Sequence, residues 1–389
     1  MNSFKGANES KIIPQRIKEA REYCHLSVAE LADKIDKSRQ AVSQFENGTT
    51  NPTIEIISKI GESTGFPIQY FFKPKRPYNT SASQIPLYRG SPTKTKSIKR
   101  SYEIAAEWSS DIICYLKDYV ILMDVNLPKG LEFDFLNDVD VERRIEDVAE
   151  KLRDYWSLGK GPVRDIVGIL ENNGFIVSKI PHKTKEVEAF SLWSDKIPHI
   201  FYEGNRDTST SYIFSICHEL GHLILHSGLQ EADIPNKDAY NKIEHQANLF
   251  AGAFLLPAET FGNEYLTSNL NSFIELKLKW GVSLGAMIMR AYALEIINDY
   301  QKSYLFRQLS ARGYRRHEPF DDEIEFAGPS IIMNSIKMLA DSKIISVDDF
   351  VNEMALPKNV LISICAFSLE FVKKYLEPHR NIPKLQLIK

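Results

Sequence analysis

The chain has few cysteines and no long apolar run, and both absences narrow what it can be. Its cysteines are widely scattered and form no C-x-x-C pair: Cys24, Cys114, Cys217 and Cys365. That spacing argues against a disulfide framework and against a cysteine zinc site, and it fits a reducing compartment. No apolar stretch approaches the length of a membrane span, and residues 1–11 lack the apolar core of a signal peptide. We therefore expect a cytoplasmic protein with no membrane partner.

The overall charge is nearly balanced, but acidic residues are missing from one stretch. The 389 residues include 48 Lys or Arg and 51 Asp or Glu, a net charge of −3 that by itself says nothing about nucleic acid. Residues 73–100 contain eight basic residues, four prolines and no acidic residue. We predict that they form a linker without regular structure. This linker either contacts a phosphate backbone or acts only as a solubilising tether, and the sequence leaves both alternatives open.

The chain does contain a complete H-E-x-x-H motif, within residues 213–226, which read IFSICHELGHLILH. Residues four apart lie on one face of a helix, so His218 and His222 can bind the same metal ion. Glu219 is placed beside them to take a proton from a water molecule. Zn²⁺ suits these ligands and leaves one position open in a catalytic site. The apolar neighbours predict a buried helix, where unpartnered polar groups are costly, and this argues against a solvated helix face.

A third protein ligand has to come from outside this motif. The metzincin class is excluded, because Leu225 and Gly228 stand where its extended motif has Gly and His. His226 lies one turn beyond His222, too far along a straight helix to join both histidines at one ion. We expect His226 to act as a hydrogen-bond partner or to lie at the helix end.

A second apolar helix, predicted over residues 243–257, offers a better ligand. Glu244 can supply the carboxylate, and Asn248 lies on the same face, where it can hydrogen-bond to a ligand. Ala247 between them is small enough for the helices to approach closely. His245, about 100° further round the helix, is the alternative ligand.

The two segments together resemble the ImmA/IrrE family of zinc metallopeptidases. The resemblance is carried by HELGHLILH and by EHQANLFAGAFLLP, with further similar segments at 154–162, 170–174 and 279–290. It covers roughly residues 140–320 and implies a zincin-like fold with a small sheet beside the metal helix. It also implies His218 and His222 as ligands, Glu219 as general base and Glu244 as third ligand. The run Ser211–Cys217 departs from the Arg and Thr-Leu-Ala that often precede the motif in the family.

The amino-terminal residues 14–72 read as a compact module of short helices. Ser27 and Glu30 predict a capping box, and Ser38 caps a helix that Gly48 ends. The module resembles the XRE-type (Cro/repressor-like) helix-turn-helix domain of five-helix type. The matching positions are Leu31, Ala32, Ser38, Val42, Ser43, Phe45, Glu46, Asn47, Gly48, Pro52 and Thr53.

In such a module the second helix of the motif enters the major groove of double-stranded DNA. Arg39 and Gln40 are the first candidates for base contacts, since Arg reads guanine and Gln reads adenine through paired hydrogen bonds. Ser43 and Gln44 come next on the same side. The alternative is a module that binds a protein instead of DNA, because the domain is not strongly basic and fold does not fix function.

The remaining segments alternate helices with a few strands. Helices are expected at 102–116, 142–158, 163–173, 270–280 and 284–299, and strands at 175–180, 187–193 and 199–202. Within the second strand, Phe190–Trp193 either holds a substrate backbone as an edge strand or, as we favour, lies in the core of the sheet. Residues 302–328 are polar, and 329–377 form a helical tail with one helix after Ser346 and a longer one over 358–375.

These observations predict an α+β, mostly α, fold in four parts. They are a helix-turn-helix domain at 1–72, the linker at 73–100, a zinc metallopeptidase domain at 101–328 and a helical region at 329–389. The expected function is a DNA-binding regulator fused to a zinc endopeptidase that cleaves a regulatory protein, such as a separate repressor. The alternative is a regulator or antitoxin-like protein whose metal domain binds a partner without proteolysis. The oligomeric state is open, a homodimer included.

Two mechanistic points are also left open by the sequence. The oxyanion of a cleaved peptide needs a second donor, and the sequence does not rank the candidates Tyr202, Tyr240, Arg290 and His226. An intracellular endopeptidase must also avoid indiscriminate cleavage. We therefore expect the basic linker or the helical tail to dock near the metal cleft and hold the peptidase quiet. Self-cleavage within 73–100 is a less favoured variant of this idea.

Overall fold

The chain divides into two compact units, and each is described by itself. One unit comprises Met1–Lys75, Ile112–Val120 and Ser330–Lys389, and the other comprises Arg76–Asp111 and Ile121–Pro329. The structure is a computed structural model, and it describes residues 11–75, 87–88, 96–131, 139–181, 188–194, 196–204, 208–229, 234, 236–264 and 269–377. Much of the predicted linker, including Arg76, Arg89 and Lys94, lies outside the described residues.

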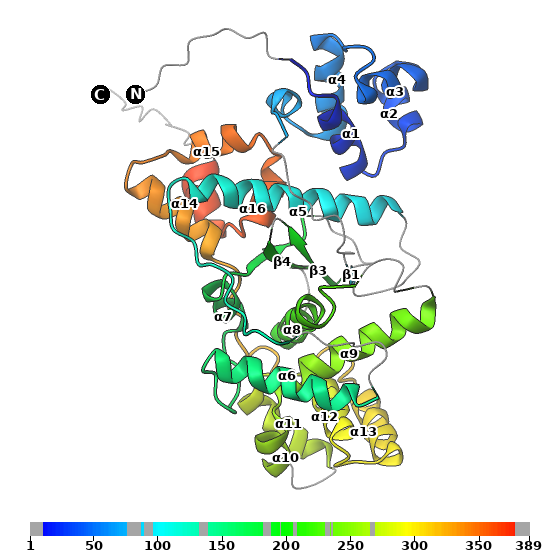
Figure 1. Cartoon of the computed structure of the whole chain (residues 1–389), viewed down its shortest axis with the longest axis vertical. Coiled ribbons are helices and arrows are strands. Elements are labelled where there is room, and N and C mark those ends of the chain that lie inside the picture. The colour runs from blue at the N-terminus through cyan, green and yellow to red at the C-terminus, as the bar shows by residue number, and fades with distance from the viewer. Residues whose placement is uncertain are drawn as a thin grey trace, which may run out of the picture. The chain divides into compact units, whose positions relative to one another are not determined.

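The first unit begins with a bundle of short helices (Figure 1). Its elements are α1 (Pro14–Tyr23), α2 (Val28–Lys34), α3 (Arg39–Asn47), α4 (Ile54–Thr64) and the 3₁₀ helix η1 (Ile68–Phe72). The predicted capping box is confirmed: Ser27 Oγ accepts from the Glu30 N–H at 3.1 Å, and the Glu30 carboxylate accepts from the Ser27 N–H at 2.7 Å. Gly48 ends α3 with φ 72°, a left-handed conformation that favours glycine.

The carboxyl-terminal residues of the first unit form a second group of helices. These are α14 (Ile331–Asp341), α15 (Val347–Met354), α16 (Lys358–Ile364), α17 (Leu369–Phe371) and η3 (Val372–Leu376). The prediction of a single helix over 358–375 is wrong. Ala366 has φ 51°, which breaks the helix, and Ser368 then caps a new one by accepting the Phe371 N–H at 3.1 Å.

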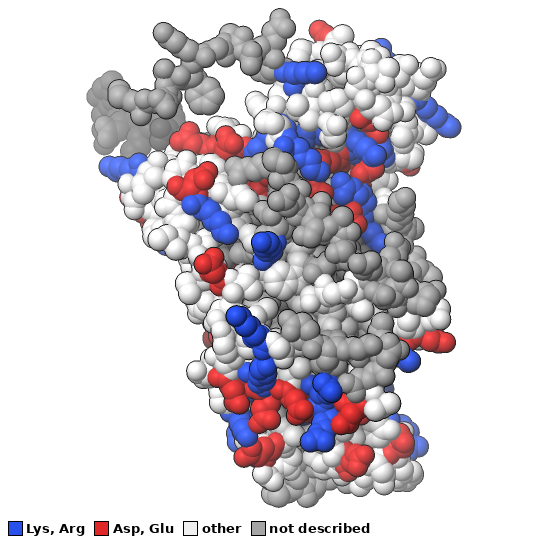
Figure 2. All heavy atoms as spheres, in the orientation of Figure 1, with Lys and Arg blue, Asp and Glu red and all other residues white. Residues whose placement is uncertain are grey.

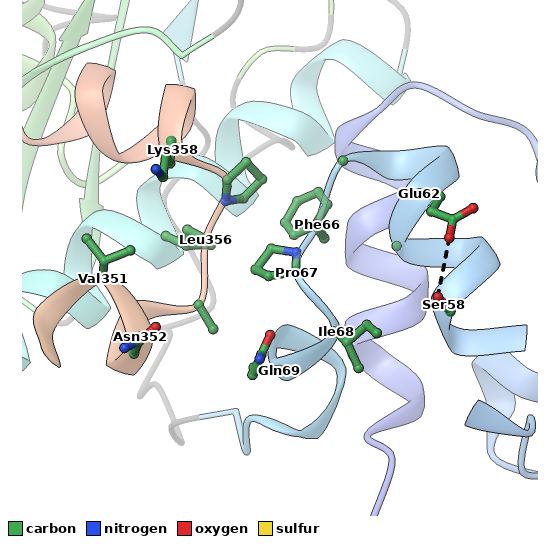
Figure 3. Close-up of a pocket in the computed structure, with 14 residues that line it drawn as sticks. Ser58, Glu62, Phe66, Pro67, Ile68, Gln69, Val351, Asn352, Leu356 and Lys358 are labelled. Carbon is green, nitrogen blue, oxygen red and sulfur yellow. Dashed lines mark hydrogen bonds between the residues drawn. The ribbon is translucent and has the colours of Figure 1, made fainter. Parts of the chain in front are cut away.

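A cavity of about 570 Å³ opens within the first unit, between the end of α4 and the turn from α15 to α16. Figure 3 shows Phe66, Pro67 and Leu356 turned toward this space, with the Ser58–Glu62 hydrogen bond on α4 beside it. The amino-terminal and carboxyl-terminal segments therefore lie close together in this unit, although some 280 residues separate Lys73 from its hydrogen-bond partner, the backbone carbonyl of Glu353.

The second unit contains a small mixed sheet of four strands in the order β1-β3-β4-β2. They are β1 (Leu87–Tyr88), β2 (Ile176–Lys179), β3 (Ala189–Ser194) and β4 (Ile197–Tyr202). β3 and β4 form an antiparallel hairpin, β2 runs parallel to β4, and β1 runs antiparallel to β3. The three predicted strands are confirmed, with residue 187 outside the described part. β1 was not predicted, because its two residues lie in the Pro- and Ser-rich linker.

Helices cover this sheet and extend the second unit away from it. They are α6 (Val141–Tyr155), α7 (Ile166–Asn172), α8 (Ser209–Leu225), α9 (Lys237–Leu255), α10 (Ala258–Glu264), α11 (Leu270–Trp280), α12 (Leu284–Ala293) and α13 (Asp299–Ala311). α5 (Lys96–Lys117) runs through both units. The helix expected over 284–299 is wrong in its second part: it ends at Ala293, Glu295 has φ 55°, and Asn298 begins a new capping box with Gln301 at the start of α13. The predicted mostly helical fold with a small sheet is confirmed.

The core of the second unit lies where α8 and α9 pack on each other and on the sheet. Its fully buried side chains include Ile216, Leu220, Phe250 and Phe254. α6 packs against α9 with one face, and Figure 2 shows basic and acidic side chains interspersed in the lower part of the view, where α6 lies. No helix in the described part of the chain is long and apolar enough to cross a membrane.

Candidate metal centre

The H-E-x-x-H motif lies in the buried middle of α8, as its apolar neighbours require. His218 and Glu219 are fully buried, and His222 is 2% exposed. The Nε2 atoms of the two histidines lie 3.0 Å apart, so the i, i+4 spacing directs both rings to one point.

The carboxylate of Glu244 reaches the same point from α9. Its oxygens lie 3.6 Å from His218 Nε2 and 3.4 Å from His222 Nε2. One ligand atom from each of these three residues lies within 4.8 Å of the other two. Burial raises the pKa of Glu244, but the two histidines beside it outweigh burial and hold that pKa well below its usual range. The group is therefore a carboxylate that faces two imidazole nitrogens.

A second layer of hydrogen bonds decides which nitrogen of each histidine carries a proton. Asn248 Oδ1 lies 3.0 Å from His218 Nδ1, so this oxygen accepts the Nδ1–H and leaves a lone pair on Nε2. His226 Nε2 lies 2.9 Å from Gln246 Oε1, and His226 Nδ1 lies 3.0 Å from His222 Nδ1. Burial, with His222 alongside, lowers the pKa of His226 to about 3, so this ring is neutral. It donates to Gln246 and accepts from His222, whose Nε2 lone pair is then free to face inward.

The arrangement fits a divalent cation. Two Nε2 lone pairs directed at each other at 3.0 Å repel, and a carboxylate beside them adds negative charge. Tetrahedral zinc with bonds of about 2.0–2.2 Å takes this donor set of two imidazoles and one carboxylate. His218, His222 and Glu244, the three ligands predicted from the sequence, are the residues brought together here.

Close approach of α8 and α9 makes this convergence possible. A Cβ built on Gly221 would lie 3.1 Å from Phe250 Cδ1 and 3.3 Å from Ala247 Cα. Gly221 and Ala247 thus let the backbones of the two helices meet beside the histidines. The role expected for Ala247 agrees with this geometry, whereas the need for glycine between the histidines was not recognised in the sequence.

Glu219 points to the sheet and is held there by β3. Ser191 Oγ donates to Glu219 Oε2 at 2.7 Å and lies 3.2 Å from the Glu219 backbone oxygen. Ser191 and Gln246 are residues of this site that the sequence did not suggest. A serine in a strand 28 positions earlier carries no local signal for this contact.

The residues suggested as oxyanion donors lie in different places in the structure. The hydroxyl of Tyr240 lies at the site, where burial and its hydrogen bond to Glu244 raise the pKa of Tyr240. Arg290 instead pairs with Glu146 and donates to the Leu256 carbonyl, and Tyr202 packs in the core.

His245, the alternative ligand, does not point to the metal centre. Its side chain is 60% exposed, and its Nε2 lies 3.7 Å from Glu142 Oε1. The 100° step round α9 that separates His245 from Glu244 accounts for this difference.

The four residues expected to contact DNA are placed on α3 of the first unit. Arg39, Gln40 and Ser43 are exposed and Gln44 is half-buried. Ser38 caps the helix by accepting the Ala41 N–H at 3.1 Å, and so positions the exposed first turn.

The fold and the site agree with two family models that match parts of the chain. A peptidase family model described as the IrrE N-terminal-like domain matches residues 171–292, and a helix-turn-helix model matches residues 17–71. These matches confirm both predicted resemblances. No curated protein is significantly similar to the chain. Parts of the chain thus match a helix-turn-helix model and a peptidase-family model.

Proposed function

We propose that this chain is a DNA-binding regulator with a zinc-dependent endopeptidase centre. His218, His222 and Glu244 hold the zinc, and Glu219 is the general base. The observation that carries the proposal is the convergence of two Nε2 lone pairs and one carboxylate, beside a buried second carboxylate held by Ser191. The exposed face of α3, with Arg39, Gln40, Ser43 and Gln44, binds double-stranded DNA.

The chemistry divides between the metal and the side chains around it. When bound, zinc supplies a Lewis acid that polarises the scissile carbonyl and makes a water molecule more acidic. Glu219 takes the proton of the attacking water and later delivers it to the leaving amine. Ser191 positions Glu219 through its 2.7 Å hydrogen bond. Tyr240, whose hydroxyl already lies at Glu244, donates to the oxygen that becomes negative in the transition state.

The substrate that fits this combination is a regulatory protein, such as a separate repressor. A peptidase in the same chain as a DNA-binding domain can be brought to promoters where its substrate acts. Cleavage would then be confined to a small set of proteins by location as well as by sequence.

The test is hydrolysis of a proteome-derived peptide library by the zinc-loaded full chain, read by mass spectrometry. We expect the wild type to generate new termini and Glu219→Gln, at equal zinc content, to generate none. His245→Ala is the matched control and should cleave like the wild type. Equal cleavage by Glu219→Gln would remove the proposed base. No cleavage by a zinc-loaded wild type, with co-expressed repressors also intact, would favour a domain that binds a partner without proteolysis.

A further inference from the structure

One strand of the sheet comes from the linker, and it pairs beside the candidate metal centre. β1 contains only Leu87 and Tyr88, and it lies antiparallel to β3 with Leu87 opposite Ser191 and Tyr88 opposite Phe190. Paired strands lie about 4.8 Å apart, so the backbone of β1 is a direct neighbour of Ser191. Ser191 is the residue whose hydroxyl holds Glu219.

β3 itself lies against the helix that carries the metal motif. Ser191 Oγ contacts the carboxylate and the backbone oxygen of Glu219, and Trp193 Nε1 donates to the Leu223 carbonyl at 3.2 Å. The strand therefore runs along α8 past the general base. A polypeptide paired with the outer side of β3 would pass its main chain in front of Glu219.

We propose that Leu87–Tyr88 of the same chain occupies the outer side of β3, where it competes with any extended substrate strand that pairs there. This inference rests on the proposed function and identifies the segment of the chain that fills the substrate site. Strand addition to a sheet edge recognises main chain, with side chains only refining the choice. The linker segment is such a main chain, already in antiparallel register with β3.

Another polypeptide can displace Leu87–Tyr88 from β3, because the described pairing is short. Among the described residues, β1 pairs with two of the six residues of β3. A substrate strand that paired with all six residues of β3 would form more main-chain hydrogen bonds than Leu87 and Tyr88 do. The linker is tethered, and a tethered ligand acts at an effective concentration of the order of mM. It therefore excludes weakly bound polypeptides and yields to a substrate with a longer match.

The test removes the main-chain donors of β1 in the full chain. Successive residues of a strand point their N–H groups to opposite sides, so one of the two faces β3. The double variant Leu87→Pro/Tyr88→Pro loses that donor whichever residue supplies it. The control Leu87→Ala/Tyr88→Ala changes both side chains and keeps both donors.

Two readouts are independent of peptide hydrolysis. Hydrogen exchange of residues 189–194 in the metal-free protein should be faster in the proline variant than in the wild type or the alanine control. The affinity of the zinc-loaded protein for the hydroxamate of a short extended peptide should rise about tenfold, the factor expected when a tethered competitor leaves its site. Unchanged exchange would show that the pairing is absent in solution. Faster exchange with unchanged affinity would show that β1 does not compete with polypeptide.

The same variants separate this inference from the proposed function. If the hydroxamate binds more tightly to the proline variant but neither protein cleaves any peptide, the strand site stands and the peptidase proposal fails. If the wild type cleaves peptides and the proline variant does so with the same kcat/KM and the same hydroxamate affinity, the peptidase stands and the occupied strand site is wrong.

Discussion

At the scale of single residues, the proposed metal centre depends on side chains outside the proposed ligand set. Asn248 fixes the orientation of His218, and the His226–Gln246 pair fixes that of His222. The hydrogen bonds at Nδ1 of His218 and His222 keep a proton on that nitrogen and free Nε2, while His226 carries its own proton on Nε2 and donates it to Gln246. The sequence suggested Asn248 and His226 for such roles, because they lie one helical turn from a ligand. It gave no reason to choose Gln246.

The Asn248 contact leads to a prediction for metal affinity. Asn248→Ala leaves His218 Nδ1–H without the acceptor that orients the ring. Loss of such a partner typically weakens metal binding by about 10–100-fold. Competition with a chromophoric chelator measures this directly. His245→Ala changes a neighbouring exposed side chain on α9 and should bind zinc like the wild type, and equal affinities for the two variants would contradict the role given to Asn248.

A buried histidine outside the metal centre makes stability depend on pH. His199 of β4 is fully buried beside Ser110 Oγ at 3.1 Å, and burial lowers the pKa of His199 to about 3. In the unfolded chain its pKa is about 6.5, so between these values the unfolded state binds more protons. The stability that neutral His199 permits is therefore present above pH 6.5 and is lost as pH falls.

The size of this pH dependence follows from the one proton that His199 takes up when the chain unfolds. From pH 7 to pH 5 the wild type should lose about 2 kcal/mol more of its free energy of unfolding than His199→Gln, which does not titrate. Urea unfolding of both proteins at the two pH values gives the comparison. Parallel losses in both would mean that His199 is not kept neutral in the folded chain.

At the scale of elements, the sequence predicts structure where the signal is local. Ser27 with Glu30, Ser38 and Gly48 are capping signals read within four residues, and the helices they bound are observed as expected. The metal motif is equally local within α8. The breaks at Ala366 and Glu295 were missed, because neither alanine nor glutamate marks a left-handed position and only packing in the folded chain selects it.

The contact between α8 and α9 carries its own prediction. Gly221→Val would place branched carbons where Phe250 and Ala247 already lie within 3.3 Å of an added Cβ. Such overpacking costs about 1–3 kcal/mol and separates the helices that share the metal. Thermal unfolding should show a lower Tm, and zinc affinity should fall with it. Gly228→Ala, which meets nothing within 4 Å, should change neither, and a Gly221→Val protein with wild-type Tm would show that the helices can move apart freely.

α3 is the element on which DNA recognition is proposed to rest. The double variant Arg39→Ala/Gln40→Ala removes two exposed side chains that can read base edges, and each such contact is worth about 1–3 kcal/mol of discrimination. We expect it to lose preference for a sequence selected from random DNA but to keep weak, salt-sensitive binding. Fluorescence anisotropy over a salt series measures both. Lys34→Ala, on the neighbouring helix α2, should keep the preference, and a wild type without DNA affinity even at low salt would favour a protein-binding module.

At the scale of the whole molecule, segments far apart in the sequence belong to the same compact unit. The sequence predicted the helical tail as a separate region. In the structure, the residues from Ser330 onward group with Met1–Lys75 in one compact unit. Tyr115 of α5 packs within this unit against Phe350, with ring centroids 5.8 Å apart. A grouping of this kind depends on contacts between residues hundreds of positions apart, which no periodicity or cap in a single sequence reveals. β1 was missed because its two residues lie in the Pro- and Ser-rich linker and pair with a strand far along the chain.

This grouping predicts how the chain unfolds. Phe350→Ala and Ile57→Ala both remove fully buried side chains of the first unit, and each should cost about 2–5 kcal/mol. Calorimetry should show that both variants lower the same transition. Phe254→Ala, in the core of the second unit, should lower a different one. If Phe350→Ala instead moves a transition that Ile57→Ala leaves in place, the tail folds independently of the amino-terminal helices.

The central claim is that α8 and α9 build one metal centre from His218, His222 and Glu244. Zinc content of the purified full chain, measured by elemental analysis on wild type, Glu244→Ala and His245→Ala, tests it most directly. We predict about one zinc per chain in the wild type and in His245→Ala, and strongly reduced zinc in Glu244→Ala. Full zinc in Glu244→Ala together with loss in His245→Ala would contradict the claim.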